Sequence, residues 1–469
     1  MNQGSTYLSS QTISQALDCV IEDDWAGSGV SIDSRTLEMG DLFVALQGPT
    51  HDGHDYVVKA LEKGAIAAVV SHRPENCSDD ARLLFTPDTM IALENLGVAA
   101  RDGMNGKVIA VTGSVGKTGT KEMLRLALSN QGVVTASDGN LNNHYGVPLS
   151  LSRMKAETKF GIFEVGMNHP GEIRPLVRMV RPHVAIVTAI EAAHTEFFSS
   201  VEQIADAKAE IFEGLEPGGV AIINQDSEFY ERLADAARVA GAKNIIGFGG
   251  NPDSQARLIN VNMQGETSFV EANIDGVFVD YELGVPGMHH VMNSLAVLAA
   301  ISAAGGNVKT SATCLVKFRP LKGRGVRTVI KLDDGSDVVL IDESYNASPA
   351  SMQASLDVVG RIEPSGSGRR IAVLGDMLEL GLDTAELHRN LVTNLESNNF
   401  DLVFACGQHM LELWNTLPQS MRGGYSISPE KLSMVVISSL RNGDVVVAKG
   451  SLGSRVGVVV NALLELGEG

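Results

Sequence analysis

A glycine-rich turn that carries a lysine and a threonine holds the residues of this chain with the clearest chemistry. It reads Gly113-Ser114-Val115-Gly116-Lys117-Thr118-Gly119 and lies between a β-branched run at 108–111, which predicts a buried strand, and apolar positions at helical spacing in 123–128. Strand, glycine turn, Lys-Thr and helix can cradle phosphates, because backbone N–H groups and the helix N-terminus attract the anion. Lys117 would reach the terminal phosphates, and the Thr118 hydroxyl can hold Mg²⁺. The flanking elements favour nucleotide phosphates over the alternative, a plain turn with a solvated lysine.

This turn is a shortened variant of the general phosphate-binding loop. The general pattern has a further glycine two positions before Gly113, where this chain has Val111. The match therefore depends on the strand and the helix around the turn.

Two further features follow predicted strands of the same region. Glu164 stands at the end of the strand expected at 161–165, where a carboxylate faces the loop and can coordinate Mg²⁺ directly or through water; otherwise it is an acid in solvent. The loop 138–148 holds Asn140, Asn142 and Asn143, whose amides suit a polar neutral ligand as well as they suit a turn.

A helical pattern at 201–215 contains a lysine within its apolar stripe. Lys208 shares one face with Val201, Ile204, Ile211 and Leu215. Such a lysine extends its amine to solvent, finds a partner or loses its charge. Extension to solvent is the ordinary outcome. A desolvated neutral amine could instead act as a base, or add CO₂ to become a carbamate, which can replace a carboxylate as a metal ligand.

Composition limits the classes of partner. The formal net charge of −19 argues against non-specific binding of nucleic acids or anionic membranes, which need a basic field. The four cysteines are scattered without a CxxC pair, which is typical of reduced thiols in a cytoplasmic protein. We expect no secretory signal, because the first residues lack an apolar core, and no transmembrane helix, because no apolar run is long enough.

Strand and helix patterns divide the 469 residues into three α/β domains, expected at 1–106, 107–318 and 319–469. The central part alternates strand and helix, as in a parallel sheet with helices on both faces, and the last part repeats the alternation as a Rossmann-like, doubly wound domain. The segment 318–326, rich in glycine and basic residues, is expected to be a hinge. Beyond 108–111, strands are expected at 133–136, 161–165, 184–188, 220–223, 244–248, 338–341, 371–374, 402–405 and 445–448.

In the small N-terminal α/β part, Ser34 and Arg35 precede a predicted strand. They can anchor a phosphate or a base, or they form a capped turn with a surface arginine. The residue types alone leave both interpretations open.

Taken together, the motifs resemble those of the Mur ligases, the ATP-dependent amide ligases of bacterial cell-wall precursor synthesis. The resemblance covers nearly the whole chain and includes the specific segments GNLNN, DESYNASP and GDMLELG. It implies that ATP drives the joining of D-alanyl-D-alanine to UDP-N-acetylmuramoyl-tripeptide through an acyl phosphate. We also expect a chain that works as a monomer in the cytoplasm, without nucleic acid or membrane insertion. The supporting segments are DSRTLEMGDLFVAL, TGSVGKTGTKEM, GNLNNHYGVPLSL, FEVGMNHPGEI, AHTEFF, AKAEIF, PGMHHVMN, DESYNASPASM, GDMLELG and AKGS.

The resemblance also implies two magnesium ions beside the catalytic Lys117. Thr118 and Glu164 match positions that hold one Mg²⁺. His194 and Lys208 match positions that serve a second ion, with Lys208 as a carbamate. By itself, His194 would more often be a satisfied polar side chain than a ligand.

The remaining site residues are implied in the same way. Ser34 and Arg35 would lie in the uridine pocket, and Asn140, Asn142 and Asn143 would contact substrate. Residues 113–119 bind ATP. Three further contacts to ATP are implied at Asn293, which faces adenine, at Arg324 on the hinge, and at Asp342. Asp376 and Lys449 would line the dipeptide pocket, although both can equally be structural residues at strand ends.

Two departures from the family pattern concern these contacts. The usual His-Asn pair before the adenine asparagine is His289-His290 here, and the usual Lys-Gly-Ser-Arg ends in Leu452, with the next arginine at Arg455. Another amide ligase of the superfamily is one alternative function. A P-loop binding or switch protein is a second, but it would have little use for the asparagine loop or the third domain.

Overall fold

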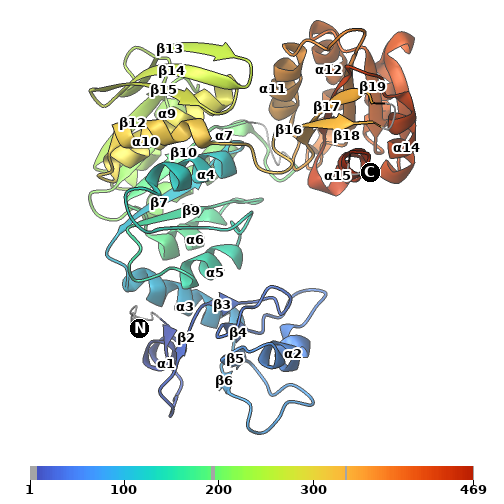
Figure 1. The fold of residues 1–469 in the computed structure, drawn as a ribbon. Coiled ribbons are helices and arrows are strands. Elements are labelled where there is room, and N and C mark those ends of the chain that lie inside the picture. The colour runs from blue at the N-terminus through green and yellow to red at the C-terminus, as the bar shows by residue number, and fades with distance from the viewer. Residues whose placement is uncertain (1–7, 192–195, 333–334, 468–469) are drawn as a thin grey trace.

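The structure, a computed structural model, describes residues 8–191, 196–332 and 335–467. Three larger sheets follow one another along the chain, each with its own helices (Figure 1). The first unit lies at the bottom of the view, the central unit in the middle, and the third at the upper right, joined to the second by an extended hinge. No helix among the described residues has the length and apolarity needed to cross a bilayer.

The first unit is built on a parallel sheet in the order β3-β4-β5-β6, beside a short antiparallel β1-β2 pair. Its core combines apolar residues of these strands with the inner faces of the first and third helices. The bounds are β1 (Leu8–Ser9), α1 (Ser10–Leu17), β2 (Ala26–Gly27), β3 (Val30–Ser31), β4 (Leu42–Val44), α2 (Val57–Glu62), β5 (Ala67–Val70), β6 (Leu83–Phe85) and α3 (Thr89–Asp102).

The central unit carries the phosphate-binding loop, and the predicted strand before that loop is one of the inner strands of its sheet. The strands are β7 (Lys107–Thr112), β8 (Val134–Ala136), β9 (Phe160–Glu164), β10 (Val184–Val187), β11 (Val220–Asn224), β12 (Asn244–Gly249), β13 (Ala256–Gln264), β14 (Thr267–Ile274) and β15 (Val277–Leu283). The helices are α4 (Lys117–Leu128), α5 (Gly146–Ser152), α6 (Ile173–Val180), α7 (Val201–Ala209), α8 (Tyr230–Val239), α9 (Met288–Ala303) and α10 (Val308–Cys314).

Over the described residues this sheet runs β15-β14-β13-β12-β11-β10-β7-β9-β8. Helices α4, α9 and α10 cover one face, while α5, α6, α7 and α8 cover the other, so the predicted two-sided packing is confirmed. The expected parallel sheet is confirmed from β8 to β12, and an antiparallel extension is added to it. Residues 256–283 form an antiparallel meander of β13, β14 and β15 that extends the sheet.

The third unit has the doubly wound arrangement that the sequence predicts, with an antiparallel edge strand. Its described strands run β16-β17-β21-β18-β19-β20, and only the pairing of β16 with β17 is antiparallel. Helices α11, α12 and α13 pack on one face, and α14 and α15 on the other. The bounds are β16 (Val326–Lys331), β17 (Asp337–Glu343), α11 (Pro349–Gly360), β18 (Arg370–Gly375), α12 (Thr384–Ser397), β19 (Leu402–Cys406), α13 (Met410–Thr416), β20 (Arg422–Ser426), α14 (Pro429–Ser439), β21 (Val445–Lys449) and α15 (Gly457–Glu465).

The helix expected at 201–215 is shorter than its apolar pattern. Its α-helical part, α7, ends at Ala209, and a 3₁₀ turn continues from Glu210 to Gly214. Lys208 lies within the α-helical part and is buried, as the periodicity predicts.

Candidate active site

The loop between β7 and α4 needs glycine at two positions. A Cβ atom on Gly113 would lie 1.9 Å from Thr188 Oγ1. Gly116 has φ +87°, in the left-handed region, and a Cβ atom there would lie 2.7 Å from Asn293 Nδ2. The loop therefore packs against β10 and α9 without any side chain between them, which leaves its backbone free to face a ligand.

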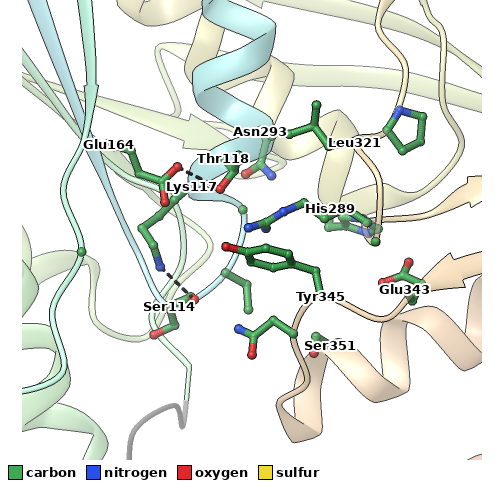
Figure 2. Close-up of a pocket in the computed structure, with 18 of the residues that line it drawn as sticks. Ser114, Lys117, Thr118, Glu164, His289, Asn293, Leu321, Glu343, Tyr345 and Ser351 are labelled. Carbon is green, nitrogen blue, oxygen red and sulfur yellow. Dashed lines mark hydrogen bonds between the residues drawn. The ribbon is translucent and has the colours of Figure 1, made fainter. Parts of the chain in front are cut away.

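Lys117 begins α4 and curls over this loop. Its Nζ donates to the carbonyl oxygen of Gly113 at 2.6 Å and to that of Ser114 at 3.3 Å (Figure 2). Burial lowers the pKa of the Lys117 amine, an effect that the Glu164 carboxylate opposes. The amine is thus held by its own loop, at the place where phosphate oxygens would replace the two carbonyls.

Glu164 joins the loop to the neighbouring strand. Its Oε2 accepts from Thr118 Oγ1 at 2.8 Å, its Oε1 accepts from Asn142 Nδ2 at 2.7 Å, and its backbone N–H donates to Ser137 Oγ at 3.1 Å. The carboxylate is buried, so it does not lie in solvent, and Figure 2 shows it beside Thr118. A hydroxyl and a carboxylate in contact at a phosphate-binding loop are the hard oxygen donors that Mg²⁺ prefers. These residues therefore fit a magnesium ion.

Lys208 does not extend its amine to solvent. The residue is 1% exposed, and burial together with the nearby Lys117 charge lowers its pKa well below the ordinary value. The lowered pKa leaves the reactive alternative open. His194, the other residue expected at a second metal ion, lies outside the described residues.

A cavity of about 300 Å³ opens between the loop and the third unit. It brings together residues that are far apart in the sequence, and Figure 2 shows the ring of Tyr345 reaching from the third unit towards the loop. Arg324 stacks over that ring, 4.1 Å from its centre. The lining of the cavity includes Ser114, Val115, Gly116, Lys117, Thr118, Gly119, Asn142, Glu164, His289, Asn293, Arg324, Glu343, Tyr345 and Lys449.

Asp342, expected to contact ATP, is engaged with the hinge. Its Oδ2 accepts from Gly323 N at 2.9 Å, and its Oδ1 accepts from the N–H and the hydroxyl of Ser344 at 3.1 and 2.6 Å. Its backbone oxygen accepts from Gly325 N at 2.7 Å. Asp342 therefore fixes the hinge segment that presents Arg324 to the cavity, and its carboxylate is not among the groups that line it.

The two residues expected at the dipeptide pocket differ in placement. Lys449 lines the cavity and donates to Glu343 Oε2 at 3.1 Å and to the Asn346 carbonyl oxygen at 3.0 Å. Asp376 instead accepts from Met410 N at 2.8 Å, at the start of α13. Arg455, the basic residue after Leu452, is exposed and paired with Glu430 on α14.

The remaining predicted residues belong to the first unit and to the asparagine loop, and of these Asn142 lines the cavity. Ser34 is buried, while Arg35 is exposed and paired side by side with Asp33, as in the surface-turn alternative. In the asparagine loop only Asn142 reaches the cavity. Asn143 Oδ1 accepts from Gly146 N at the start of α5, and Asn140 is exposed.

Sequence reasoning missed several lining residues. Glu343, Tyr345 and Ser351 were not singled out as site residues, although each stands in a quoted motif. The signal was available in DESYNASPASM, where residues beside Asp342 follow the end of a strand at the edge that binds ligands. His290 also lines the cavity, with its Nδ1 buried and without a hydrogen bond to any described residue.

A methyl group at Gly116 should disturb nucleotide binding more than one at Gly119. Gly116→Ala forces alanine into a left-handed conformation, a strain on the order of 1–3 kcal/mol, and crowds Asn293. We expect its affinity for ADP to fall at least about tenfold, measured by calorimetric titration. At Gly119 an added Cβ meets nothing within 4 Å, so Gly119→Ala should show the smaller loss. Equal losses in the two variants would contradict the packing described here.

Three family models match successive and partly overlapping parts of the chain. Residues 28–122 match the Mur ligase family catalytic domain, residues 111–301 the Mur ligase middle domain, and residues 327–452 the Mur ligase glutamate ligase domain. A curated relative from Rickettsia prowazekii, UDP-N-acetylmuramoyl-tripeptide–D-alanyl-D-alanine ligase, is 33% identical over 96% of this chain and 98% of its own length.

Solved structures show the same fold. MurF from Acinetobacter baumannii superposes with a TM-score of 0.84 at 28% identity, covering 98% of this chain and 99% of that one. MurF ligase from Thermotoga maritima in complex with ADP gives a TM-score of 0.77 at 27% identity, over 94% and 98% of the two chains. With a phosphate-binding loop that faces a hinged third unit, and with relatives that match from end to end, this chain belongs to the Mur ligase family.

Proposed function

We propose that this chain is the ATP-dependent ligase that joins D-alanyl-D-alanine to UDP-N-acetylmuramoyl-tripeptide, giving the pentapeptide precursor of peptidoglycan. The observation that carries the proposal is the match to relatives of that activity over nearly the whole chain, with the loop, Glu164 and the hinge assembled around one cavity. We place the reaction in the cytoplasm, where ATP is available.

The proposed chemistry begins with phosphoryl transfer. The terminal carboxylate of the tripeptide attacks the γ-phosphorus of ATP, ADP leaves, and an acyl phosphate forms. Lys117 would move from the carbonyl oxygens of Gly113 and Ser114 to the transferring phosphoryl group, where it stabilises the developing charge. The amine of D-alanyl-D-alanine then attacks the acyl carbon, loses a proton, and expels inorganic phosphate.

Thr118 and Glu164 would hold one Mg²⁺, and Lys208 as a carbamate would serve a second together with His194. When bound, these ions would neutralise negative charge on the phosphates. The part of this chain is to keep oxygen donors in place: Asn142 orients the Glu164 carboxylate through its 2.7 Å bond to Oε1.

The hinge would protect the acyl phosphate. Residues 323–325 are bonded to Asp342, so they move with the third unit, and Arg324 and Tyr345 move with them towards the loop. Closure of the cavity excludes water, which would otherwise hydrolyse the intermediate.

One assay separates this function from its alternatives. Release of inorganic phosphate from ATP is expected only when UDP-N-acetylmuramoyl-tripeptide and D-alanyl-D-alanine are both present. Release with another amino acid in place of the dipeptide would indicate a different amide ligase. Release without either substrate would indicate an ATPase or switch protein.

The third unit should decide which amine is used. A chimera of residues 1–318 with the third domain of a Mur ligase that adds a different amino acid should change the amine incorporated and keep the same UDP substrate. The products can be identified by mass spectrometry. An unchanged amine would place the dipeptide pocket outside residues 319–469.

A further inference from the structure

Lys121 is a lysine without exposed surface that the reaction described above does not use. It lies on α4, one turn after Lys117, and it is not among the residues that line the cavity. Its Nζ donates to the carbonyl oxygen of Ser137 at 2.7 Å and to that of Gly139 at 3.1 Å, and it lies 3.1 Å from Glu122 Oε1. These three partners match the three N–H groups of an ammonium.

The two carbonyl groups belong to the segment that leaves β8: Ser137 directly follows that strand, and Gly139 lies in the asparagine loop, residues 138–148. This segment contacts Glu164 through residues on both sides of Gly139. Ser137 Oγ accepts from Glu164 N at 3.1 Å, and Asn142 Nδ2 donates to Glu164 Oε1 at 2.7 Å. The Asn142 carbonyl oxygen also accepts from Gly166 N at 2.8 Å. The position of the Glu164 carboxylate therefore depends on the position of the asparagine loop.

Lys121 connects that loop to the helix that presents Thr118. Within a helix the backbone N–H groups are used by carbonyls of the preceding turn, so α4 can supply donors to a neighbouring loop only through side chains. Lys121 supplies them, and the bond to the Ser137 carbonyl oxygen is buried, where a carbonyl group without a donor is costly. Its bonds span from α4 to the loop, as the bond from Thr118 Oγ1 to Glu164 Oε2 spans from α4 to β9.

We propose that Lys121 is a positioning residue for the metal–nucleotide site: it holds the asparagine loop against α4, so that Asn142 and the Glu164 carboxylate stay beside Thr118. The proposal rests on the proposed function in one respect, the assignment of a divalent ion to Thr118 and Glu164. It predicts a selective defect in metal binding, because the bonds of this network join α4, the asparagine loop and β9, all within the central unit.

The test uses the full chain with Lys121→Met, which fills similar space and removes all donors. Mn²⁺ binding in the presence of ADP is measured from the EPR signal of free Mn²⁺. We expect the dissociation constant of Mn²⁺ to rise at least tenfold, and the half-saturating Mg²⁺ concentration in the ligase assay to rise in parallel. The KM for D-alanyl-D-alanine should stay within twofold of the wild type.

Lys159→Met is the matched control. Lys159 also donates its Nζ to a backbone carbonyl oxygen, that of Gln131 at 2.8 Å, but it is exposed and lies just before β9, away from Glu164. Its Mn²⁺ affinity should equal that of the wild type. A Lys121→Met variant that binds Mn²⁺ as tightly as Lys159→Met overturns the proposal.

A double-mutant cycle tests the route through Asn142. If Lys121 acts by holding the loop, Asn142→Ala and Lys121→Met together should weaken Mn²⁺ binding little more than the stronger of the two alone. If the losses of Mn²⁺ affinity in the two single variants multiply in the double variant, Lys121 acts independently of the loop, and the proposal would fail.

If Lys121→Met does not fold, Lys121→Arg takes its place in the test, because arginine keeps a positive charge and several hydrogen-bond donors. Any defect in this variant should then appear in Mn²⁺ affinity; a uniform fall in kcat with unchanged Mn²⁺ affinity overturns the proposal. A wild-type chain that does not ligate would instead refute the proposed function. A wild type that ligates beside a Lys121→Met variant with normal Mn²⁺ affinity refutes this inference alone.

Discussion

Lys117→Ala is expected to lower turnover at least about a hundredfold, equivalent to about 2.7 kcal/mol in the activation free energy. The substitution removes the only side-chain charge that the loop itself carries, while the glycines at 113 and 116 keep its backbone shape. A positive charge aimed at the transferring phosphoryl group matters more in the transition state than in the bound substrate. The loss should therefore appear mainly in kcat, measured by phosphate release with both substrates saturating.

Affinity for the UDP substrate provides the internal control. The UDP end of this substrate is expected to bind the first unit. The dissociation constant of Lys117→Ala for the substrate should therefore be close to that of the wild type. Lys107→Ala is the matched variant, because Lys107 is an exposed lysine at the opposite end of the same strand, β7. Wild-type turnover in Lys117→Ala would refute the assignment of the loop to ATP.

The features that the sequence could predict are those decided by neighbours along the chain. The loop at 113–119 needs only a strand before it and a helix after it, and both are present. The buried side of Lys208 follows from helical spacing over one element. The placement of Glu164 beside the loop was predictable because the carboxyl ends of parallel strands lie at the same edge of the sheet.

The antiparallel meander was missed although its turns carry a local signal. Asp275-Gly276 lies between two alternating runs, and both residues have positive φ, +51° and +86°. Asp-Gly between such runs is a strong indication of a hairpin. The expectation of strand–helix alternation was extended too far along the chain, over a segment whose period of two indicated strands only.

The roles of several charged residues depended on contacts distant in sequence. Asp342 and Gly323 meet because the hinge folds back on the end of β17, and Asp376 meets the start of α13 because β18 and β19 are adjacent. In the sequence, Lys121 is an ordinary helix residue. Only the fold shows that its amine donates to a carbonyl oxygen of the segment after β8. Periodicity identifies the face on which a residue lies, but it does not identify the partner across that face.

The second large effect is expected at Lys208, a buried lysine that is proposed to serve a metal ion as a carbamate. Burial and the Lys117 charge lower the pKa of its amine well below the ordinary value, which makes the neutral form more accessible than it is for a lysine in solvent. A neutral amine can add CO₂: the nitrogen forms a bond to carbon, one C=O π pair moves onto oxygen, an N–H proton leaves to solvent, and the neutral group becomes an anion. A carbamate offers oxygen to Mg²⁺, whereas an ammonium repels it. We therefore infer that the working form of Lys208 is the carbamate.

Lys208→Arg should be nearly inactive, with turnover lowered by about a thousandfold, because a guanidinium keeps its positive charge and cannot form this carbamate. Its thermal unfolding and its affinity for ADP should show a folded chain that binds nucleotide. Lys208→Ala leaves space in place of the side chain, and a small carboxylate can enter that space. Acetate at high concentration should then restore part of the activity of Lys208→Ala and none of that of Lys208→Arg.

The two variants together distinguish a ligand from a packing residue. A lysine that only packed beneath the loop would tolerate arginine better than alanine, and acetate would have no effect on either variant. A carbamate predicts the opposite order in the presence of acetate, with Lys208→Ala more active than Lys208→Arg. Retention of most turnover by Lys208→Arg would exclude the carbamate, because the buried charge at this position would then be compatible with catalysis.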